Sequence, residues 1–133
     1  MSLANYRDFH VIGDERGSLV VLDKSTGIPF EIERVYYLFG MSDAESRGFH
    51  AHKKLHQIAF CISGTCTMIL DDGMKREQHH LDSPNIGIDL PPMLWHEMSH
   101  FSEDCVLLVL ASDEYKETDY IRDYHEFRRL SLI

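Results

Sequence analysis

The chain has 133 residues, 44% of them hydrophobic and 26% charged, and a formal net charge of −9. This length suits a single domain over residues 1–133, and the acidic balance argues against DNA or RNA partners, which bind to basic surfaces. No apolar run approaches the ~20 residues that cross a bilayer. Because the first residues contain no apolar leader segment, we expect neither a membrane span nor a secretory signal.

Short segments rich in β-branched and aromatic residues recur along the chain, separated by Gly, Asp, Asn and Pro, and this pattern predicts strands. Tight turns at Ser63-Gly64 and Asp72-Gly73 indicate hairpins. Many closely spaced strands favour an all-β sandwich or barrel. In chain order the predicted strands cover residues 17–23, 32–40, 48–52, 56–64, 65–72, 75–81, 85–91, 94–101 and 105–113.

The C-terminal segment has a different periodicity. Apolar side chains recur there at helical spacing, and they are Tyr120, Ile121, Tyr124 and Phe127. This spacing predicts a helix over residues 117–130 that packs across the barrel. Thr118 or Asp119 would serve as its N-cap.

The three cysteines, Cys61, Cys66 and Cys105, lie inside apolar, strand-like segments. An odd number of cysteines in such segments indicates reduced, buried thiols rather than a disulfide framework. We therefore expect a cytoplasmic protein.

The segment RGFHAHKKLHQ (residues 47–57) contains a pair of histidines, His50 and His52, that share one face if the segment is a strand. His96 follows in a distant strand, after a proline turn. This arrangement resembles the two-motif pattern of the cupin superfamily, in which metal-binding members add a glutamate shortly after the histidine pair. Here His56 and Gln57 occupy those positions.

Three interpretations of these histidines remain open: a metal site, a proton-transfer site, or a solvated surface. The missing glutamate and the nearby cations Arg47, Lys53 and Lys54 disfavour a bound metal ion. A histidine with an ordinary pKa near 6.5 can accept and return a proton at neutral pH. An adjacent arginine suits a reaction with an anionic intermediate such as an enediolate.

Several sequence blocks together resemble a known family, the cupin-fold sugar nucleotide 3,4-ketoisomerases (the dTDP-4-dehydro-6-deoxyglucose 3,4-oxoisomerase group, WxcM-like). The resemblance extends from about Arg16 to Phe127. The blocks are D-x-RGSL (14–19), IPFEIERVYYLF (28–39), RGFHAHKKLHQ (47–57), LDDG (70–73), LDSPNIG (81–87), WHEM (95–98) and FSEDCVLLVLASDEYKETDYIRDY (101–124).

This resemblance implies an all-β cupin jelly roll with a C-terminal helix, acting as a homodimer without metal or other cofactor. The implied reaction moves the keto group of a dTDP-linked 4-keto-6-deoxyhexose from C4 to C3 through an enediolate. Such a product is a precursor of 3-amino-3,6-dideoxysugars, which are found in lipopolysaccharide and S-layer glycans. The sequence does not distinguish the galacto from the gluco product, nor identify the final glycan.

The resemblance also implies roles for individual residues. His50 and His52 match the active-site histidines, and we expect His52 to remove the C3 proton. Tyr36 is expected to contact the enediolate, because it shares a strand face with Arg34, whereas Val35, Tyr37 and Phe39 are expected to be core. The residues predicted to bind substrate are Arg16, Arg47, Tyr37, Lys54 and His96, of which Tyr37 is the alternative to Tyr36 in the cavity.

Two other functions remain open at this stage. A dTDP-4-dehydrorhamnose 3,5-epimerase would share the fold, the substrate type and the histidine base, although the sequence blocks match that family less well. A metal-dependent cupin dioxygenase or a sugar-binding cupin would instead need an ion at the histidines.

Overall fold

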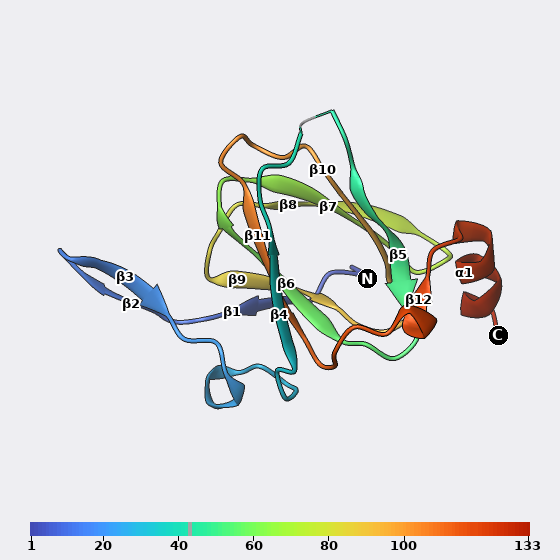
Figure 1. The fold of residues 1–133 in the computed structure, drawn as a ribbon, viewed down its shortest axis with the longest axis horizontal. Helices are drawn as coiled ribbons and strands as arrows, with labels where there is room; N and C mark the ends of the chain where they lie inside the picture. The colour runs from blue at the N-terminus through green and yellow to red at the C-terminus, as the bar shows by residue number, and fades with distance from the viewer. Residues whose placement is uncertain (43) are drawn as a thin grey trace.

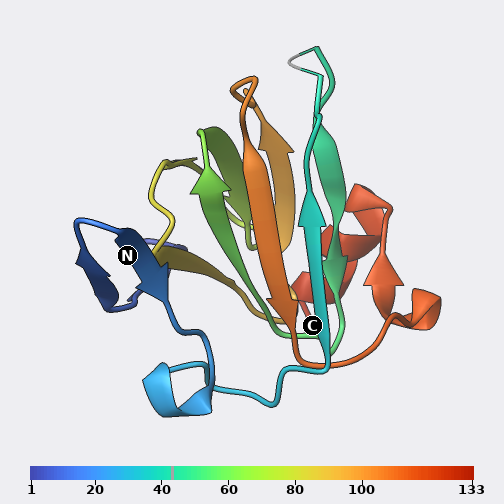
Figure 2. The same ribbon diagram turned by 60° about the vertical axis from the view of Figure 1, so that its left-hand side comes forward.

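Two five-stranded antiparallel sheets face each other in the computed structural model, which describes residues 1–42 and 44–133 (Figure 1). The first sheet has the order β1-β9-β6-β11-β4 and the second the order β12-β5-β10-β7-β8. A separate hairpin, β2-β3, extends away from both sheets (Figure 2). This arrangement confirms the prediction of an all-β jelly roll.

The strands of the first sheet are β1 (Tyr6–Asp8), β9 (Ile86–Leu90), β6 (Gln57–Ser63), β11 (Val106–Ala111) and β4 (Arg34–Leu38). Those of the second sheet are β12 (Tyr120–Ile121), β5 (Arg47–His52), β10 (Trp95–Ser99), β7 (Cys66–Asp71) and β8 (Arg76–Leu81). The hairpin consists of β2 (Val11–Asp14) and β3 (Gly17–Val20). The helical elements are the short 3-10 helices η1 (Lys24–Thr26) and η2 (Glu117–Asp119) and the α-helix α1 (Tyr124–Ser131). No helix in the described part of the chain is long and apolar enough to cross a membrane.

The main core fills the space between the two sheets. Alternate residues of β7 point inward, and Met68 and Leu70 pack in one cluster with Leu107 and Val109 of β11. This is the period-two pattern on which the strand predictions were based. The burial of these side chains fixes the register of the strands, since a slip of one residue would expose all of them.

Each sheet also has an outer face, and these faces are covered to different extents. The chain before β4 covers β6, where Phe9 and Ile28 pack on Ile58 and Phe60. On the second sheet, Phe127 of α1 packs with Trp95, Ala51 and Ile121. Trp95 is therefore a core residue, as expected.

The outer face of β4 is not covered. Val35, Tyr37 and Phe39 are 55%, 61% and 69% exposed, so the prediction that they belong to the core is wrong. Their alternation with Arg34, Tyr36 and Leu38 was correct. However, β4 is the edge strand of its sheet, and no other element of the described chain lies over its outer face.

The C-terminal segment differs from its prediction as well. The α-helix begins at Tyr124 with Asp123 as its N-cap, several residues later than expected. Tyr120 and Ile121 instead pair with β5 as the edge strand β12. Asp119, a predicted cap, accepts hydrogen bonds from the backbone amides of Lys54 and Leu55. The open edge of β5 thus binds a segment whose side-chain spacing suits a helix.

The N-terminal region contains further differences. The predicted strand over residues 17–23 ends at Val20, because Asp23 begins the helix η1 through a reciprocal capping box with Thr26. The strands β1 and β2 were not predicted. β1 adds to the edge of the first sheet beside β9.

A β-bulge interrupts β5 at Gly48 and Phe49, whose φ angles are +92° and +61°. In the pairing with β10, His50 lies opposite His96, Gly48 opposite Glu97, and Arg47 opposite Met98. Phe49 therefore has no partner and is the extra residue of the bulge. Because His96 and Met98 share the inward face of β10, the bulge turns Arg47 inward together with His50. Simple alternation would have placed Arg47 outward.

Only glycine fits at the first position of this bulge. A Cβ on Gly48 would lie 2.9 Å from the carbonyl oxygen of His96 and 3.2 Å from Cα of Glu97. We expect Gly48→Ala to lower the free energy of unfolding by more than about 2 kcal/mol, through backbone strain combined with this overlap. Chemical denaturation would measure the change.

Gly40→Ala is the matched control, because Gly40 also has a positive φ, +67°, but its Cβ would meet no atom within 4 Å. It should cost only the backbone strain, about 1 kcal/mol. Equal losses in the two variants would show that the bulge tolerates a side chain.

Candidate active site

Two adjoining cavities lie at the end of the sandwich where β4, β5 and β12 meet. An inner cavity of about 300 Å³ is lined by residues that include His50, His96, Tyr36 and Arg47. An outer cavity of about 410 Å³ is lined by His52, Lys53, Lys54, Lys116 and Asp119, among others. Arg34 and Tyr120 line both. Together the cavities have the size and mixed polarity of a small-molecule site.

Three imidazoles meet where the two cavities adjoin, His50 and His96 lining the inner cavity and His52 the outer one. His50 and His52 come from β5 and share its inward face, as their spacing predicted. The ring centre of His50 lies 5.2 Å from that of His52 and 4.6 Å from that of His96. The Tyr120 ring lies against both β5 histidines, 4.2 Å from His52 and 5.1 Å from His50. The structure thus brings together the three histidines singled out in the sequence.

Each imidazole has an oxygen acceptor near its Nδ1 atom. The acceptor is the carbonyl oxygen of Gly48 for His50, at 3.1 Å, and that of Leu94 for His96, at 3.4 Å. For His52 it is Oδ2 of Asp119, at 3.3 Å. Since an oxygen acceptor places the proton on Nδ1, the lone pair lies on Nε2. The carbonyl contacts orient His50 and His96 as bases acting through Nε2. The nearby Asp119 carboxylate favours the same tautomer for His52, although its distance to Nδ1 is that of an ion pair and both ring nitrogens of His52 are buried without a hydrogen-bond partner.

Burial keeps these rings neutral. Loss of solvation lowers the pKa of His96 to about 3, and the neighbouring His50 and His52 lower it further. Burial and the proximity of His50 lower the pKa of His52 to about 4, against the opposing effect of Asp119. The pKa of His50 is also lowered, mainly by burial. A cluster of neutral imidazoles at pH 7 can accept protons but does not carry positive charge.

Asp119 is held in place independently of any ligand. Its Oδ1 accepts the backbone N–H of Lys54 at 2.9 Å, and its Oδ2 that of Leu55 at 3.1 Å. The backbone carbonyl of the same residue accepts the N–H of Lys53. This arrangement leaves the carboxylate fixed beside Nδ1 of His52, where it can select the tautomer and stabilise the protonated ring.

Arg34 supplies the cation of the site. Its guanidinium lies over the rings of Tyr36 and Tyr115, at 5.0 Å and 6.0 Å from their centres. In the described part of the chain it takes part in no salt bridge, and its Nε is buried without a hydrogen-bond partner. An unneutralised guanidinium at the wall of both cavities is suited to bind an anion.

Tyr36, rather than Tyr37, faces the cavity. Its hydroxyl donates to Oε1 of Gln57 at 2.6 Å, and burial raises its pKa to about 12. Tyr36 therefore remains a hydrogen-bond donor throughout the physiological pH range. The prediction that Tyr36 is the inward residue of the pair is confirmed.

The other predicted substrate-binding residues divide into two groups. Lys54 lines the outer cavity, and Arg47 lines the inner one. Tyr37 lines neither cavity and is exposed, so within one chain it does not reach the site. Arg16 lies at the tip of the β2-β3 hairpin, where it forms an ion pair with Asp14, and within one chain it does not reach the site.

Asp119 and Tyr120 were not predicted as site residues, because both were assigned to the predicted helix. Arg34 was mentioned only because it shares a strand face with Tyr36, and no role in the site was predicted for it. The period-two alternation of β4 was a sufficient signal for Arg34, which is two residues from Tyr36. No comparable signal existed for Asp119, whose position depends on pairing between distant segments.

The histidines do not converge in the manner of metal ligands. Across residues 1–42 and 44–133, the only group of three His, Cys, Asp or Glu residues with ligand atoms within 4.8 Å of one another is Cys61, Cys66 and Cys105. The imidazoles are held by their Nδ1 contacts in positions suited to proton transfer.

Comparisons with known proteins agree with this geometry. The family described as WxcM-like, C-terminal (FdtA), matches residues 3–131. The chain is 53% identical over 122 residues to the TDP-4-oxo-6-deoxy-alpha-D-glucose-3,4-oxoisomerase of Aneurinibacillus thermoaerophilus, covering 92% of this chain and 88% of the relative.

Solved structures give the same result. A 3,4-ketoisomerase from Helicobacter canadensis superimposes with a TM-score of 0.95 at 41% identity, covering 100% of both chains. A histidine-to-asparagine mutant of a 3,4-ketoisomerase from Thermoanaerobacterium thermosaccharolyticum, in complex with TDP-4-keto-6-deoxyglucose, gives a TM-score of 0.94 at 37% identity, covering 98% of this chain and 95% of that one. These similarities confirm the predicted cupin jelly roll, and the chain belongs to the WxcM-like family of sugar nucleotide 3,4-ketoisomerases.

Proposed function

We propose that this protein moves the keto group of dTDP-4-dehydro-6-deoxy-D-glucose from C4 to C3. The observation that carries the proposal is the cluster of neutral imidazoles, each with Nε2 free, beside the unpaired guanidinium of Arg34. Bases next to a fixed cation suit a reaction through an enediolate. The substrates and names of the relatives support the same reaction.

The two cavities suggest how the substrate lies. The hexose would lie where the two cavities adjoin, against His50 and His96 on the inner side and His52 on the outer side, and the diphosphate would extend into the outer cavity near Lys53 and Lys54. The outer cavity also contains acidic groups, and Lys116 is paired with Asp113 at 2.8 Å. Lys53, Lys54 and Arg34 are the lining cations that form no salt bridge in the described chain, and they are the ones available to the diphosphate. Arg34, at the boundary, can contact an oxygen of either part.

The first step is removal of the C3 proton by Nε2 of His52. The C4 ketone acidifies this proton, and the electron pair of the broken C3–H bond forms the C3–C4 double bond as the charge moves to O4. Arg34 stabilises the resulting oxyanion. Tyr36 donates a hydrogen bond to the same intermediate once its hydroxyl turns from Gln57, with Arg47 at the rim adding positive charge.

In the second step the carbonyl forms at C3 and C4 is protonated. His50 carries the proton of the O3 hydroxyl to O4, the carbonyl forms at C3, and C4 takes a proton from an imidazolium. The product has the same number of atoms and electrons as the substrate. Since no oxidant or reductant is required, we expect the reaction to proceed without a metal or cofactor.

We also propose that the protein acts in the cytoplasm as a homodimer, in the formation of 3-amino-3,6-dideoxysugars. The three buried, unpaired cysteines support a reducing compartment. The exposed face of Val35, Tyr37 and Phe39 supports contact with a second copy. In a homodimer, Arg16 would reach a substrate only in the partner's cavity.

Incubation with dTDP-4-keto-6-deoxyglucose in deuterated buffer, followed by NMR of the product, tests the reaction. We expect the carbonyl to move from C4 to C3, equally with and without EDTA. A product that keeps its C4 carbonyl but is inverted at C3 or C5 would indicate an epimerase. Loss of activity in EDTA, restored by one ion per chain, would contradict the metal-free mechanism.

In the same assay, His52→Asn should lower turnover by at least about 10²-fold, the contribution of a general base, while dTDP still binds. His125→Asn, at an exposed position on α1, is the matched control and should retain full activity. Full turnover in His52→Asn would rule out His52 as the base.

Asp119 is a positioning residue, and Asp119→Asn tests this role. The amide cannot stabilise a protonated His52 and can present its own N–H to Nδ1, which favours the wrong tautomer. We expect kcat to fall about 10²–10⁴-fold with little change in KM. Asp82→Asn, an exposed residue away from both cavities, should leave kcat unchanged.

A pH profile tests whether a buried, neutral His52 is the base. Because the pKa of His52 is about 4, the base stays neutral as the pH falls, and kcat/KM of the wild type should be nearly constant from pH 7.5 to 5.5. A base with an ordinary pKa near 6.5 would lose about tenfold over this range. Asp119→Asn should keep the flat profile at a lower level. A wild-type midpoint near pH 6.5 would contradict the assignment.

Light scattering tests the homodimer. We expect a mass twice that of the 15.5 kDa chain. Phe39→Glu should shift the protein toward the single-chain mass, because it buries a charge at the proposed contact. Met74→Glu, at a 77% exposed position on the β7-β8 turn, should not. A wild-type protein with the mass of one chain would disprove the assembly.

A further inference from the structure

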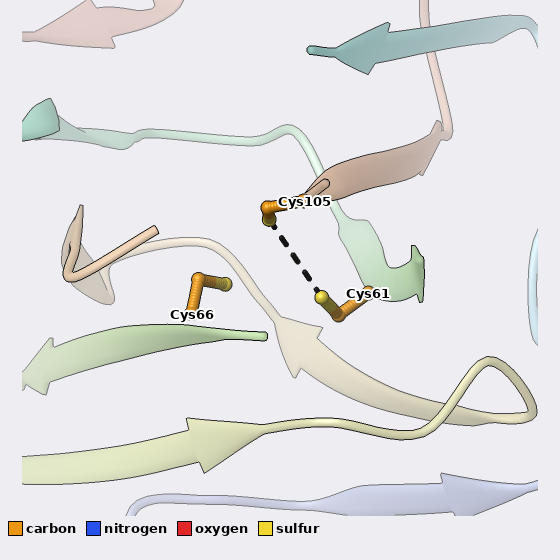
Figure 3. A group of neighbouring side chains, drawn as sticks. All are labelled: Cys61, Cys66 and Cys105. Carbon is orange, nitrogen blue, oxygen red and sulfur yellow. Dashed lines mark hydrogen bonds between the residues drawn. The ribbon is translucent and has the colours of Figure 1, made fainter. Parts of the chain in front are cut away.

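Three cysteine side chains meet in the interior, away from the histidines. Cys61 comes from β6, Cys66 from the start of β7, and Cys105 from the residue before β11, and all three sulfur atoms lie within 4.8 Å of one another. Each residue is at most 2% exposed. Figure 3 shows the three side chains directed toward a common point from separate segments of the chain. The proposed isomerase mechanism uses none of them.

We propose that these three thiols form a binding site for a soft, thiophilic cation of the Cu(I) class. The sulfur atoms of Cys61 and Cys105 are 3.8 Å apart. A metal–sulfur bond of about 2.3 Å requires sulfur atoms about 3.8 to 4.0 Å apart in tetrahedral or trigonal geometry. One edge of the coordination polyhedron is therefore already present, and only Cys66 needs to adjust.

The ligand set determines the kind of ion. In the described chain, neither an imidazole nor a carboxylate joins the three thiols as a ligand. Sulfur ligands select soft ions, whereas Mg²⁺ and Ca²⁺ require oxygen. Structural zinc sites almost always have four ligands, and this cluster provides three. A three-coordinate site in an apolar environment suits Cu(I) better than Zn²⁺.

The surroundings exclude water and competing ligands. The cysteines belong to the main core, together with Met68, Phe101 and Leu107. A disulfide between Cys61 and Cys105 would require their sulfur atoms to approach from 3.8 Å to about 2.05 Å. The separation present in the fold is that of two hydrogen-bonded thiols. It matches the spacing of two ligands of one ion and is too long for a disulfide.

Binding requires proton release but no electron transfer. Each thiol that bonds to the ion loses its proton to solvent, so affinity rises with pH. The Cys61 thiol gives up its contacts with the carbonyl oxygens of Ser63 and Gly64, both at 3.4 Å. Copper enters and remains as Cu(I), so neither an oxidant nor a reductant is consumed.

The thiol site is distinct from the histidine cavity. Cys61 lies two residues beyond Ala59, which lines the wall of the inner cavity, and four residues beyond Gln57, the partner of the Tyr36 hydroxyl, about 13 Å along an extended strand. Occupancy of the thiols therefore leaves the proposed catalytic groups in place. Copper binding and isomerase activity can be measured separately, and failure of either proposal leaves the other intact.

The test is an anaerobic titration of the reduced full chain with Cu(I), supplied from a chromophoric chelator. We expect one Cu(I) per chain to transfer from the chelator. X-ray absorption at the copper edge should then show only sulfur neighbours, at about 2.3 Å. An equimolar amount of Zn²⁺ should not displace the copper. These measurements use the wild-type protein and do not depend on a variant that folds.

Two variants locate the bound copper. Cys66→Ser should lose the stoichiometric copper while keeping its thermal unfolding transition, and His96→Asn should bind as much copper as the wild type. Three results would overturn the proposal: no transfer from the chelator, a nitrogen or oxygen shell around copper, or loss of binding in His96→Asn.

Discussion

The pairing of β12 with β5 is the interaction on which the candidate site depends. It joins Tyr120 to His52 and Ile121 to Ala51, and thereby brings together segments that are far apart in the sequence. Ile121 is anchored in the cluster formed by Trp95 and Phe127. Because this packing and the backbone hydrogen bonds exist without a ligand, Asp119 is fixed beside its histidine before any substrate arrives. Such preorganisation avoids a reorganisation cost during the reaction.

Burial provides a second constraint, and it affects acids and bases in opposite directions. It lowers the pKa of His52 and His96 and raises that of Tyr36, so that the bases stay free of protons and the phenol keeps its own. Arg34 is held by aromatic rings rather than by a carboxylate. The site therefore keeps a buried guanidinium without a carboxylate partner beside neutral imidazoles, which suits the stabilisation of a transient oxyanion.

Much of the architecture followed from local patterns in the sequence. Period-two alternation correctly placed His50 with His52, and Tyr36 opposite Tyr37, because a residue's face on a strand depends only on its immediate neighbours. The same alternation could not show that the outer face of β4 lacks a cover, since cover depends on other elements.

Features that depend on distant pairing were not predictable in this way. Asp119 and Asp123 both have the residue type and position of a helix cap, and only the open edge of β5 decides between them. The bulge at Gly48 and Phe49 was detectable in principle, because a glycine inside a strand is a signal for a bulge. Its effect on Arg47 could be established only from the register with β10. The role of Arg16 was inferred from the family resemblance rather than from local chemistry, and a single chain does not test it.

The groups proposed to bind the diphosphate and the groups proposed to move protons lie on different kinds of backbone. The lysines of the outer cavity lie on loops around β5 and η2, whereas His50, His52 and His96 lie on paired strands within the sheet. Loops tolerate substitution far better than paired strands do. Under the proposed function, contacts with the diphosphate can therefore change at positions such as Lys53 and Lys54 while the histidines keep their arrangement. Arg34, which serves both compartments, cannot change without altering both.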